Sequence, residues 1–389
     1  GQRFVAVDAL PLLDSPGEYW IDRDSLKLYL YPPVSLWDFG ETPHNVSFLL
    51  SLVPGRPDNR STLENPSGLD SDVAQGLIEL HGVSYIRLAN LTLTASTRSL
   101  LVANVSTGLT VEDCHLVGAG GNCASIQNAV GAYLLRTTIA YCGGTGLTLM
   151  GGVWYPGDDG DAAPFTTPIL PTNLWAKANI SMLNCKLHDW ARWQRIPNHP
   201  GISWSGVGHT IRGCSFENGP SPAVINQGSI DFVFEMNEVS ACPYEYNDMG
   251  AYYHGGSAGG YQYGWTQTGN HLVNNSWRHI QFVGRVPQTT DYNFTGNGLT
   301  TQAIYLDDGH SGYNVPGNHF DNVEMGVVLG GGRRHTVVNN HFSSCGRACL
   351  HIDNRGMNWA HELCGCQCSF GTCKPGCIPG GAIGPGLNE

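Results

Sequence analysis

The sequence predicts an all-β chain wound as a parallel β-helix, a solenoid in which each repeat adds one coil. A strand-like phrase recurs at intervals of 22, 27, 53, 23 and 22 residues, as GISWSGV, AVINQGS, GAYYHGG, AIYLDDG, GVVLGGG and ACLHIDN. A corner phrase, Cys or Asn followed by any residue and an apolar one, falls between them at Cys114, Cys185, Cys214, Asn237, Asn275, Asn318 and Asn340. The apolar residues follow no 3.6-residue period, which disfavours a helical array. The leucine-rich framework is also absent, and a propeller blade would need about 40 residues.

Residues 1–74 do not follow the repeat, and we expect them to form a small β-hairpin module. The segment EYWIDRDSLKLYLYPP, which begins at Glu18, alternates apolar and polar residues on either side of Asp22–Ser25. Alternation around a polar turn is typical of a hairpin. We expect the β-helix over residues 75–362. The remainder, 363–389, is rich in Cys, Gly and Pro and reads as a disulfide-rich tail or cap.

Composition and charge exclude two classes of partner. The chain has 389 residues, of which 41% are hydrophobic, so it can build a sizeable core. The 20 Lys and Arg residues against 32 Asp and Glu residues give a net charge of -12, which opposes binding to nucleic acid. No apolar run approaches the roughly 18 residues that a membrane span needs, so we expect no membrane insertion.

Cysteines and glycosylation sequons favour a secreted protein, extracellular or on the cell surface. Seven of the 13 cysteines gather at Cys345, Cys349, Cys364, Cys366, Cys368, Cys373 and Cys377. This cluster lacks paired C-x-x-C knuckles, which favours disulfides over a zinc site, and no metal is predicted. The odd total leaves one thiol free or bonded to another extracellular chain. Seven Asn-x-Ser/Thr sequons lie at Asn45, Asn59, Asn90, Asn104, Asn179, Asn274 and Asn293.

Long insertions place the candidate site near Gly250 and Ala303. Two strand phrases there are 53 residues apart, but only one corner phrase lies between them, so the strands should be on adjacent coils. The residues beyond the length of one repeat are then expected in loops. Aromatic residues that could stack on sugar rings lie in this and the preceding insertion, at Trp154, Tyr155, Trp190, Trp193, Tyr261, Tyr263 and Trp265. The alternative is that half or more of them pack loops onto the solenoid.

Alignment of the strand phrases predicts which side chains point outward. Ile202, Val224, Ala251, Ile304, Val327 and Cys349 fall in one apolar row, which should point inward. The opposite parity then places Tyr252, His254, Tyr305 and Asp307 outward on adjacent coils. Further along, Asp308 and Asp353 share a row two coils apart, and so do Arg333 and Arg355.

Carboxylates that face one cleft can divide the roles of glycoside hydrolysis. Asp248 with Asp307 or Asp308, on adjacent coils, would suit a retaining pair, and Asp308 with Asp353 would suit an inverting pair. Asp248 lies six residues before Asp307 in the alignment, about 20 Å along a straight strand, so the first pair needs a bend. Without that bend, His254 with Asp307 is the better couple.

Each of these residues also has a simpler interpretation. Asp307, Asp308 and Gly309 could form a turn that ends a strand, and adjacent Asp residues could bind calcium. Asp248 could serve a turn, Arg333 could be solvated, and His254 could be a satisfied histidine of the wall. The recurrent Asn residues are predicted to bond the backbone at corners rather than to bind ligand.

Several phrases together resemble a family of secreted right-handed β-helix proteins that includes glycoside hydrolases of the α-fucosidase and xylanase type. They are LLDSPGEYWIDRDSLKLYLYPP, NDMGAYY, AIYLDDGHSG, GVVLGGGRRHTVVNNHFSSC and HIDNRGMNW. The resemblance implies a right-handed parallel β-helix with Asp248 and Asp308 as catalytic residues and Asp307 adjacent. Members usually have a Gly-Arg-Asp-Trp-like turn where this chain has HGGSAGGYQYGW. They also start with β-helix upstream of the hairpin, so we expect the 1–74 module to be incomplete.

Three functions follow from these observations. The first is a glycoside hydrolase-like protein that acts on a polysaccharide or glycan through paired Asp residues, without a cofactor; Tyr252, His254, Tyr305, Arg333 and Asp353 are its candidate substrate contacts. The second is a non-catalytic extracellular matrix, surface or filament component built on the same scaffold. The third is a polysaccharide lyase with calcium and a basic residue such as Arg333, although the chain has only four Lys residues.

Overall fold

The computed structural model is almost entirely β-structure. It describes residues 10–12, 14, 19–22, 25, 27–31, 76–154, 175–255, 268–282, 300–353, 368–369 and 372–373. The chain divides into two compact units, Gly1–Leu50 and Ser51–Glu389. In the described ranges, the one helix is a short 3-10 turn, Leu10–Leu12, and no helix is long and apolar enough to cross a membrane.

The first unit contains the predicted hairpin. Strand β1 (Tyr19–Asp22) pairs antiparallel with β2 (Lys27–Leu30). The Asp22 carboxylate accepts a hydrogen bond of 3.2 Å from the Ser25 backbone N–H, as expected of an Asp that starts a turn. Trp20 packs against Tyr29 across the two strands, with ring centroids 5.3 Å apart.

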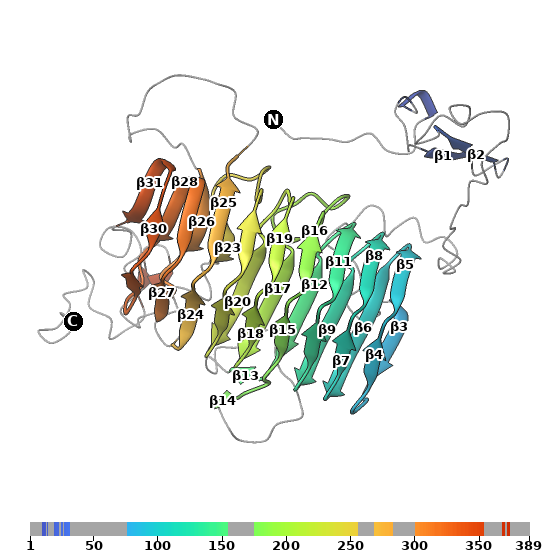
Figure 1. Cartoon of the computed structure of the whole chain (residues 1–389), viewed down its shortest axis with the longest axis horizontal. Helices are drawn as coiled ribbons and strands as arrows, with labels where there is room; N and C mark the ends of the chain where they lie inside the picture. Colours follow the sequence, from blue (N-terminus) through green and yellow to red (C-terminus); the bar gives the residue numbers. More distant parts are fainter. Residues whose placement is uncertain are drawn as a thin grey trace, which may run out of the picture. The chain divides into compact units, whose positions relative to one another are not determined.

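The second unit consists mainly of parallel strands in three columns, a column being a set of strands that are hydrogen-bonded side by side (Figure 1). The chain passes through the three columns in turn, and we call each passage a repeat. The first column contains β4 (Arg87–Ala89), β7 (Thr110–Glu112), β10 (Tyr133–Leu135), β15 (Ser181–Leu183), β18 (Thr210–Arg212), β21 (Val233–Glu235), β24 (Asn270–Val273), β27 (Tyr313–Pro316) and β29 (Thr336–Val338).

The other two columns share the long strand β28 (His319–Leu329). The second contains β5 (Thr92–Ser96), β8 (His115–Ala119), β11 (Thr138–Cys142), β16 (Lys186–His188), β19 (Ser215–Glu217), β22 (Glu238–Ser240), β25 (Ser276–Ile280), the first half of β28, and β30 (His341–Phe342). The third contains β3 (Gly76–His81), β6 (Ser99–Thr107), β9 (Ala124–Val130), β12 (Leu147–Gly151), β17 (Ile202–Val207), β20 (Val224–Ile230), β23 (Met249–His254), β26 (Thr301–Leu306), the second half of β28, and β31 (Cys345–Ile352).

Two short antiparallel pairs complete the described strands. They are β13 (Val153–Trp154) with β14 (Trp175–Ala176), and β32 (Cys368–Ser369) with β33 (Thr372–Cys373). The three-column region therefore runs from Gly76 to Ile352, inside the range predicted for the repeats.

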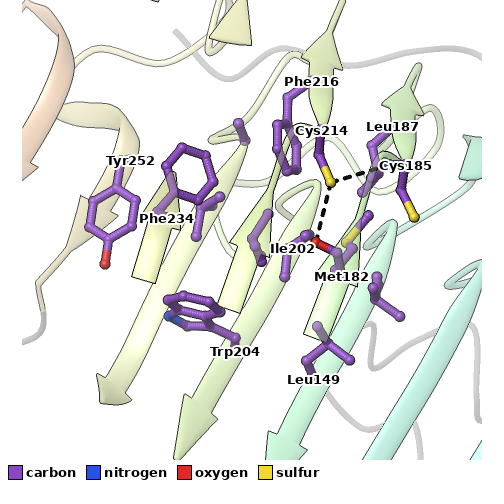
Figure 2. Packing of buried hydrophobic residues seen from close by; sticks show 14 of the residues in the cluster. Leu149, Met182, Cys185, Leu187, Ile202, Trp204, Cys214, Phe216, Phe234 and Tyr252 are labelled. Atoms are coloured by element: carbon purple, nitrogen blue, oxygen red, sulfur yellow. Dashed lines mark hydrogen bonds between the residues drawn. The ribbon is translucent and has the colours of Figure 1, made fainter. Parts of the chain in front are cut away.

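The core lies between the columns because one face of each strand is apolar. In the third column the inner row is Ile78, Leu101, Ala124, Leu147, Ile202, Val224, Tyr252, Ile304, Val327 and Leu350. Figure 2 shows Tyr252 among the buried side chains, with Phe234, Trp204 and Ile202. The row differs from the predicted one at two positions, where Tyr252 replaces Ala251 and Leu350 replaces Cys349.

Each difference is a slip of one residue. Gly250 pairs with Gln302 and not with Ala303, so every later side chain of β23 changes face relative to the prediction. Between Cys345 and Ala348, β31 has one residue more than β28 has between Val323 and Met325, which is a bulge. Since the side-chain period of a strand is two, a slip of one residue reverses the inward and outward sets.

The predicted corner residues form a continuous ladder. Asn275 Oδ1 accepts a hydrogen bond of 2.9 Å from the Asn237 backbone N–H, and Asn318 Oδ1 accepts one of 3.0 Å from that of Asn275. The same relation extends through Cys114, Thr137, Cys185, Cys214, Asn237, Asn275, Asn318 and Asn340. Figure 2 shows the step from Cys185 to Cys214. The prediction that the recurrent Asn residues bond the backbone at corners is confirmed.

Cysteines outside the ladder have mixed roles. Cys345 and Cys349, both predicted to form disulfides, bond to each other. The Cys123–Cys142 disulfide, between successive repeats, was not predicted. Cys242 is a buried free thiol, as are Cys114, Cys185 and Cys214 in the ladder. The backbones of Cys368 and Cys373 are opposite each other in the register of β32 and β33, while Cys364, Cys366 and Cys377 lie outside the described residues.

Candidate active site

The outward face of the third column carries an aromatic row near the carboxyl ends of its last strands. Tyr253, Tyr305, Val328 and His351 occupy the same register position on β23, β26, β28 and β31. Tyr253 and Tyr305 meet edge to face, with ring centroids 5.5 Å apart. Tyr305 and Val328 also pack with Met325 in a small apolar cluster on this face. As predicted, Tyr305 lies on the outward face, but its neighbour on β23 there is Tyr253 and not Tyr252.

Asp307 follows β26 and lies beside this row. Its carboxylate accepts a hydrogen bond of 3.1 Å from Tyr253 Oη and one of 2.9 Å from the Asp308 backbone N–H. Burial, together with the nearby Asp307 and Asp308 carboxylates, raises the pKa of the Tyr253 phenol, so Tyr253 remains a protonated donor. Two donors thus hold the Asp307 side chain in one orientation.

Asp307–His310 is also the turn that the simpler interpretation predicted. The His310 backbone N–H donates a hydrogen bond of 3.1 Å to the Asp307 carbonyl. Asp308 and Gly309, at the two central positions, have φ values of 48° and 78°. Positive φ at both positions defines a type I′ turn, which favours Asp and Gly. The turn positions the Asp307 carboxylate at the edge of the sheet. The interpretation of these residues as a turn is therefore compatible with their interpretation as candidate site residues.

Asp353 lies in the same row as Asp307, two repeats further on. The Gly330 backbone N–H donates to the Leu306 carbonyl at 2.7 Å, and that of Asp353 donates to the Leu329 carbonyl at 3.1 Å. Asp307, Gly330 and Asp353 are therefore equivalent positions in successive repeats. At about 4.8 Å per strand, the two Asp backbones lie about 10 Å apart. Gly330, which is buried and has no side chain, places no carboxylate between them.

The predicted pair of Asp248 with Asp308 is not brought together. The Asp248 backbone N–H donates to the Thr300 carbonyl at 3.1 Å, and β23 and β26 then run in register from Met249 to His254. Asp248 thus lies at the start of these strands and Asp308 beyond their ends, about 26 Å apart along an extended strand. The bend that the pair required is absent, because β23 pairs along its length.

Tyr252 and His254 point into the core, contrary to their prediction as outward substrate contacts. Both side chains have an exposed fraction of 0%. Tyr252 Oη lies 2.9 Å from Asn226 Nδ2, and the His254 ring stacks on His310 with centroids 3.5 Å apart. The proposed couple of His254 with Asp307 is also wrong, since the Asp307 N–H bonds the His254 carbonyl but their side chains lie on opposite faces. The one-residue slip at Gly250 is the cause.

A buried polar network therefore replaces the expected patch. Its members are Asn226, Ser229, Tyr252, His254, Asn270, His310 and Tyr313. Burial lowers the pKa of His310 to about 3 and that of His254 well below its ordinary value, so both rings are neutral. Sequence reasoning missed this network, because Asn226 and Tyr313, whose polar atoms lie 2.8 Å apart, are 87 residues apart in sequence.

The remaining predicted site residues are dispersed. Arg333 is exposed near the start of β29, where its backbone N–H donates a hydrogen bond of 3.0 Å to Ser311 Oγ. Trp190 is buried and donates from Nε1 to Ser221 Oγ at 3.0 Å, as the packing alternative predicted. Trp193 is 62% exposed. Trp154 ends β13, while Tyr155, Tyr261, Tyr263, Trp265 and Arg355 lie outside the described residues.

Three sequons are exposed on the second unit, at Asn90, Asn179 and Asn274. Each adopts a positive φ, at 55°, 50° and 54° respectively, as residues at tight corners do. Asn104 is half-buried, and its Oδ1 accepts a hydrogen bond of 2.9 Å from Asn128. Asn45, Asn59 and Asn293 lie outside the described residues. In the part of the chain that the structure describes, no group of three or more His, Cys, Asp or Glu side chains could hold a metal ion.

Comparison with known proteins relates the fold to carbohydrate enzymes. A solved chain described as "Glycoside hydrolase" superposes with a TM-score of 0.53 at 14% identity, covering 88% of this chain and 58% of its own. The present chain thus spans little more than half of that protein. The Agl-KA catalytic domain superposes at 11% identity over 71% of this chain and 47% of its own, with a TM-score of 0.26 that supports no argument. No family model and no curated protein matches. The chain has a glycoside hydrolase-like β-rich fold.

Proposed function

We propose that this chain is a secreted right-handed parallel β-helix that acts on a polysaccharide or glycan as an inverting glycoside hydrolase. The observation that carries the proposal is the row of Asp307, Gly330 and Asp353. Two carboxylates lie at equivalent positions two repeats apart, with a glycine between them. The superposition on a glycoside hydrolase chain supports the same reaction class.

The spacing of the two Asp residues suits inversion. Carboxyl groups of inverting enzymes lie about 6.5 to 9.5 Å apart, which leaves room for a water molecule beside the sugar. The two Asp backbones here are about 10 Å apart, and their side chains can lean toward each other over Gly330. Retaining enzymes need about 5 Å, the spacing of adjacent repeats, where Gly330 offers no carboxylate.

We assign the base to Asp307 and the acid to Asp353. Asp307 accepts hydrogen bonds from Tyr253 and from the Asp308 N–H, and such donors favour the ionised form of a carboxylate. Asp307 takes a proton from water as the water oxygen bonds to the anomeric carbon. The bond between that carbon and the glycosidic oxygen breaks, and Asp353 gives its proton to the departing oxygen. Tyr253 acts as a positioning residue.

Three single variants test the assignment on a panel of glycans. Asp307→Asn and Asp353→Asn should each lower kcat by about 100-fold or more, as expected of general acid and base groups. Asp248→Asn is the matched control, because it lies at the other end of the strands, and it should keep wild-type activity. NMR of the first product should give the anomer opposite to the substrate. Loss of activity in Asp248→Asn with none in Asp353→Asn would overturn the assignment.

A second candidate function is glycan binding without hydrolysis, in an extracellular matrix or surface component. It is favoured by the burial of the site, since the exposed fractions of Asp307 and Tyr305 are 7% and 5%. Under this proposal, no glycan on the panel would be cleaved by the wild-type chain, although some would bind. The two functions are therefore separated by measuring binding and product release on the same glycans.

Secretion and glycosylation are part of the proposal, and the exposed sequons Asn90, Asn179 and Asn274 support them. Expression through a eukaryotic secretory route followed by peptide mapping should find glycan on these three. Asn104 should be modified least, because its Oδ1 accepts a hydrogen bond from Asn128. A secreted chain without glycan on any of the three would argue against this part of the proposal.

A further inference from the structure

A second surface, distinct from the row of Asp307 and Asp353, lies on the segment between β16 and β17. This segment, 189–201, enters the amino end of β17 in the third column, whereas Asp307 follows the carboxyl end of β26. Two of its apolar side chains are exposed, Trp193 at 62% and Ile196 at 48%, and the neighbouring Tyr141 is exposed at 42%.

The backbone beneath Trp193 is fixed. The N–H groups of Arg192 and Trp193 donate to the carbonyls of Cys142 and Gly143 at 2.9 and 3.0 Å, and a disulfide bonds Cys142 to Cys123. A Cβ atom added at Gly143 would lie 2.9 Å from Trp193 Cδ1, so the indole rests on this glycine. The ring is therefore packed on one side and exposed on the other.

The positive charge of Arg195, in the same segment, is balanced by the carboxylate of Glu245. Its guanidinium lies 3.1 Å from the Glu245 carboxylate and donates a hydrogen bond of 3.2 Å to Tyr244 Oη. Tyr246 Oη donates to the Arg195 carbonyl, which ties the segment to the 241–248 loop. These contacts stabilise the segment and leave Arg195 no role in recognising an anion.

Arg192 differs from Arg195 in its partners. Its guanidinium carbon lies 5.4 Å from the centroid of the Tyr141 ring, a cation–π arrangement. Tyr141 is held in turn by His188, edge to face at 5.3 Å. The exposed Arg192 side chain forms no salt bridge with any residue that the structure describes. In a chain of net charge -12, an uncompensated guanidinium beside an exposed indole is a distinctive combination.

We propose that Tyr141, Arg192 and Trp193 form a binding subsite for an anionic glycan. The exposed indole face can stack on the C–H face of a pyranose ring, while the planar guanidinium can bind a carboxylate or a sulfate group of the same or the next residue. The subsite lies outside the Asp307 and Asp353 row, so it stands whether or not that row is catalytic.

Binding of the intact chain to three oligosaccharides tests the subsite: one of hexuronates, one sulfated and one neutral. Calorimetry at low and high salt should give binding to at least one anionic ligand that weakens with salt, and weaker, salt-independent binding to the neutral one. Trp193→Ala and Arg192→Gln should each raise Kd about tenfold, and Arg192→Gln should also reduce the salt dependence. The hexuronate and sulfated ligands distinguish carboxylate from sulfate recognition.

Matched controls separate this subsite from general surface effects and from the proposed catalysis. Tyr85→Ala removes another exposed aromatic residue, and Arg278→Gln another exposed arginine, so both should bind as wild type does. Asp307→Asn should lose hydrolysis but keep binding. Unchanged melting temperatures would show that the variants are folded. Wild-type Kd in both Trp193→Ala and Arg192→Gln, equal binding to the neutral ligand, or no binding to either anionic ligand would overturn the proposal.

Discussion

Tyr253 donates a hydrogen bond of 3.1 Å to Asp307 on the neighbouring repeat. This contact joins two strands that are separated by long insertions in the sequence, since Tyr253 belongs to β23 and Asp307 follows β26. It supports the role of Asp307 as the base, because a half-buried phenol that donates to a carboxylate favours its ionised form.

Tyr253→Phe tests the contact. Loss of one donor to an ionised carboxylate should lower kcat about tenfold and move the acid limb of the pH–rate profile to higher pH, because a less stabilised carboxylate protonates sooner. Tyr133→Phe, in the first column, is a matched control that should change neither quantity. An unshifted acid limb in Tyr253→Phe would contradict a positioning role.

Gly330→Val tests whether the space between Asp307 and Asp353 is used. A side chain at this register position would occupy the gap where we place the sugar and water. We expect kcat/KM to fall by about 100-fold, as for loss of productive positioning, while the melting temperature changes by a few degrees. Full activity in a folded Gly330→Val variant would rule out this gap as the site.

Asn275→Ala tests the corner ladder. Asn275 is buried, accepts a hydrogen bond of 2.9 Å from the Asn237 N–H and donates one of 2.9 Å to the Phe234 carbonyl. Its removal leaves both backbone groups unpaired, so the free energy of unfolding should fall by about 2–4 kcal/mol in a urea titration. The exposed Asn198→Ala control should change it by less than about 0.5 kcal/mol. An equally small change in the free energy of unfolding of Asn275→Ala would mean that water replaces the lost ladder hydrogen bonds.

Stability should depend on pH through buried histidines. Burial lowers the pKa of His209 to about 4 from an ordinary value of 6.5, so the unfolded chain binds a proton first as the pH falls. The free energy of unfolding should therefore rise with pH between about 4 and 6.5, by about 3 kcal/mol from this residue alone. Below pH 4 both states are protonated, and this contribution no longer changes.

Urea titrations at several pH values check this slope, and His209→Gln supplies the comparison. In this pH window, the slope of the variant should be smaller by about 1.4 kcal/mol per pH unit, because the Gln side chain does not bind a proton. His310 and His335, whose pKa values burial lowers to about 3 and about 4, should leave a residual slope in the variant. Identical slopes in both proteins would show that His209 does not titrate as described.

The sequence by itself predicted the repeat, four of the six residues named for the inward apolar row, and the Asn and Cys positions of the corner ladder. These features recur at a fixed spacing, and each repeat forms its strands from nearby residues, so a one-dimensional pattern is sufficient. The phrase around Asn237, Asn318 and Asn340 indicated the corner because the same hydrogen bond recurs in successive repeats. The hairpin around Ser25 was also predicted from the sequence, since its turn and its alternating apolar and polar residues are local features.

Only the tertiary structure decided which carboxylates share a row. A one-residue slip at Gly250 turned Tyr252 and His254 inward, and a bulge in β31 before Ala348 placed Asp353 in the row of Asp307 instead of Asp308. The sequence pattern shows that side chains alternate between the two faces of a strand. It does not show which residue of one strand pairs with which residue of the next when a long insertion separates them. The Cys123–Cys142 disulfide and the Asn226–Tyr313 contact likewise depend on the stacking of whole repeats. Strand pairing between repeats is a non-local interaction, and its register sets the face on which each side chain lies.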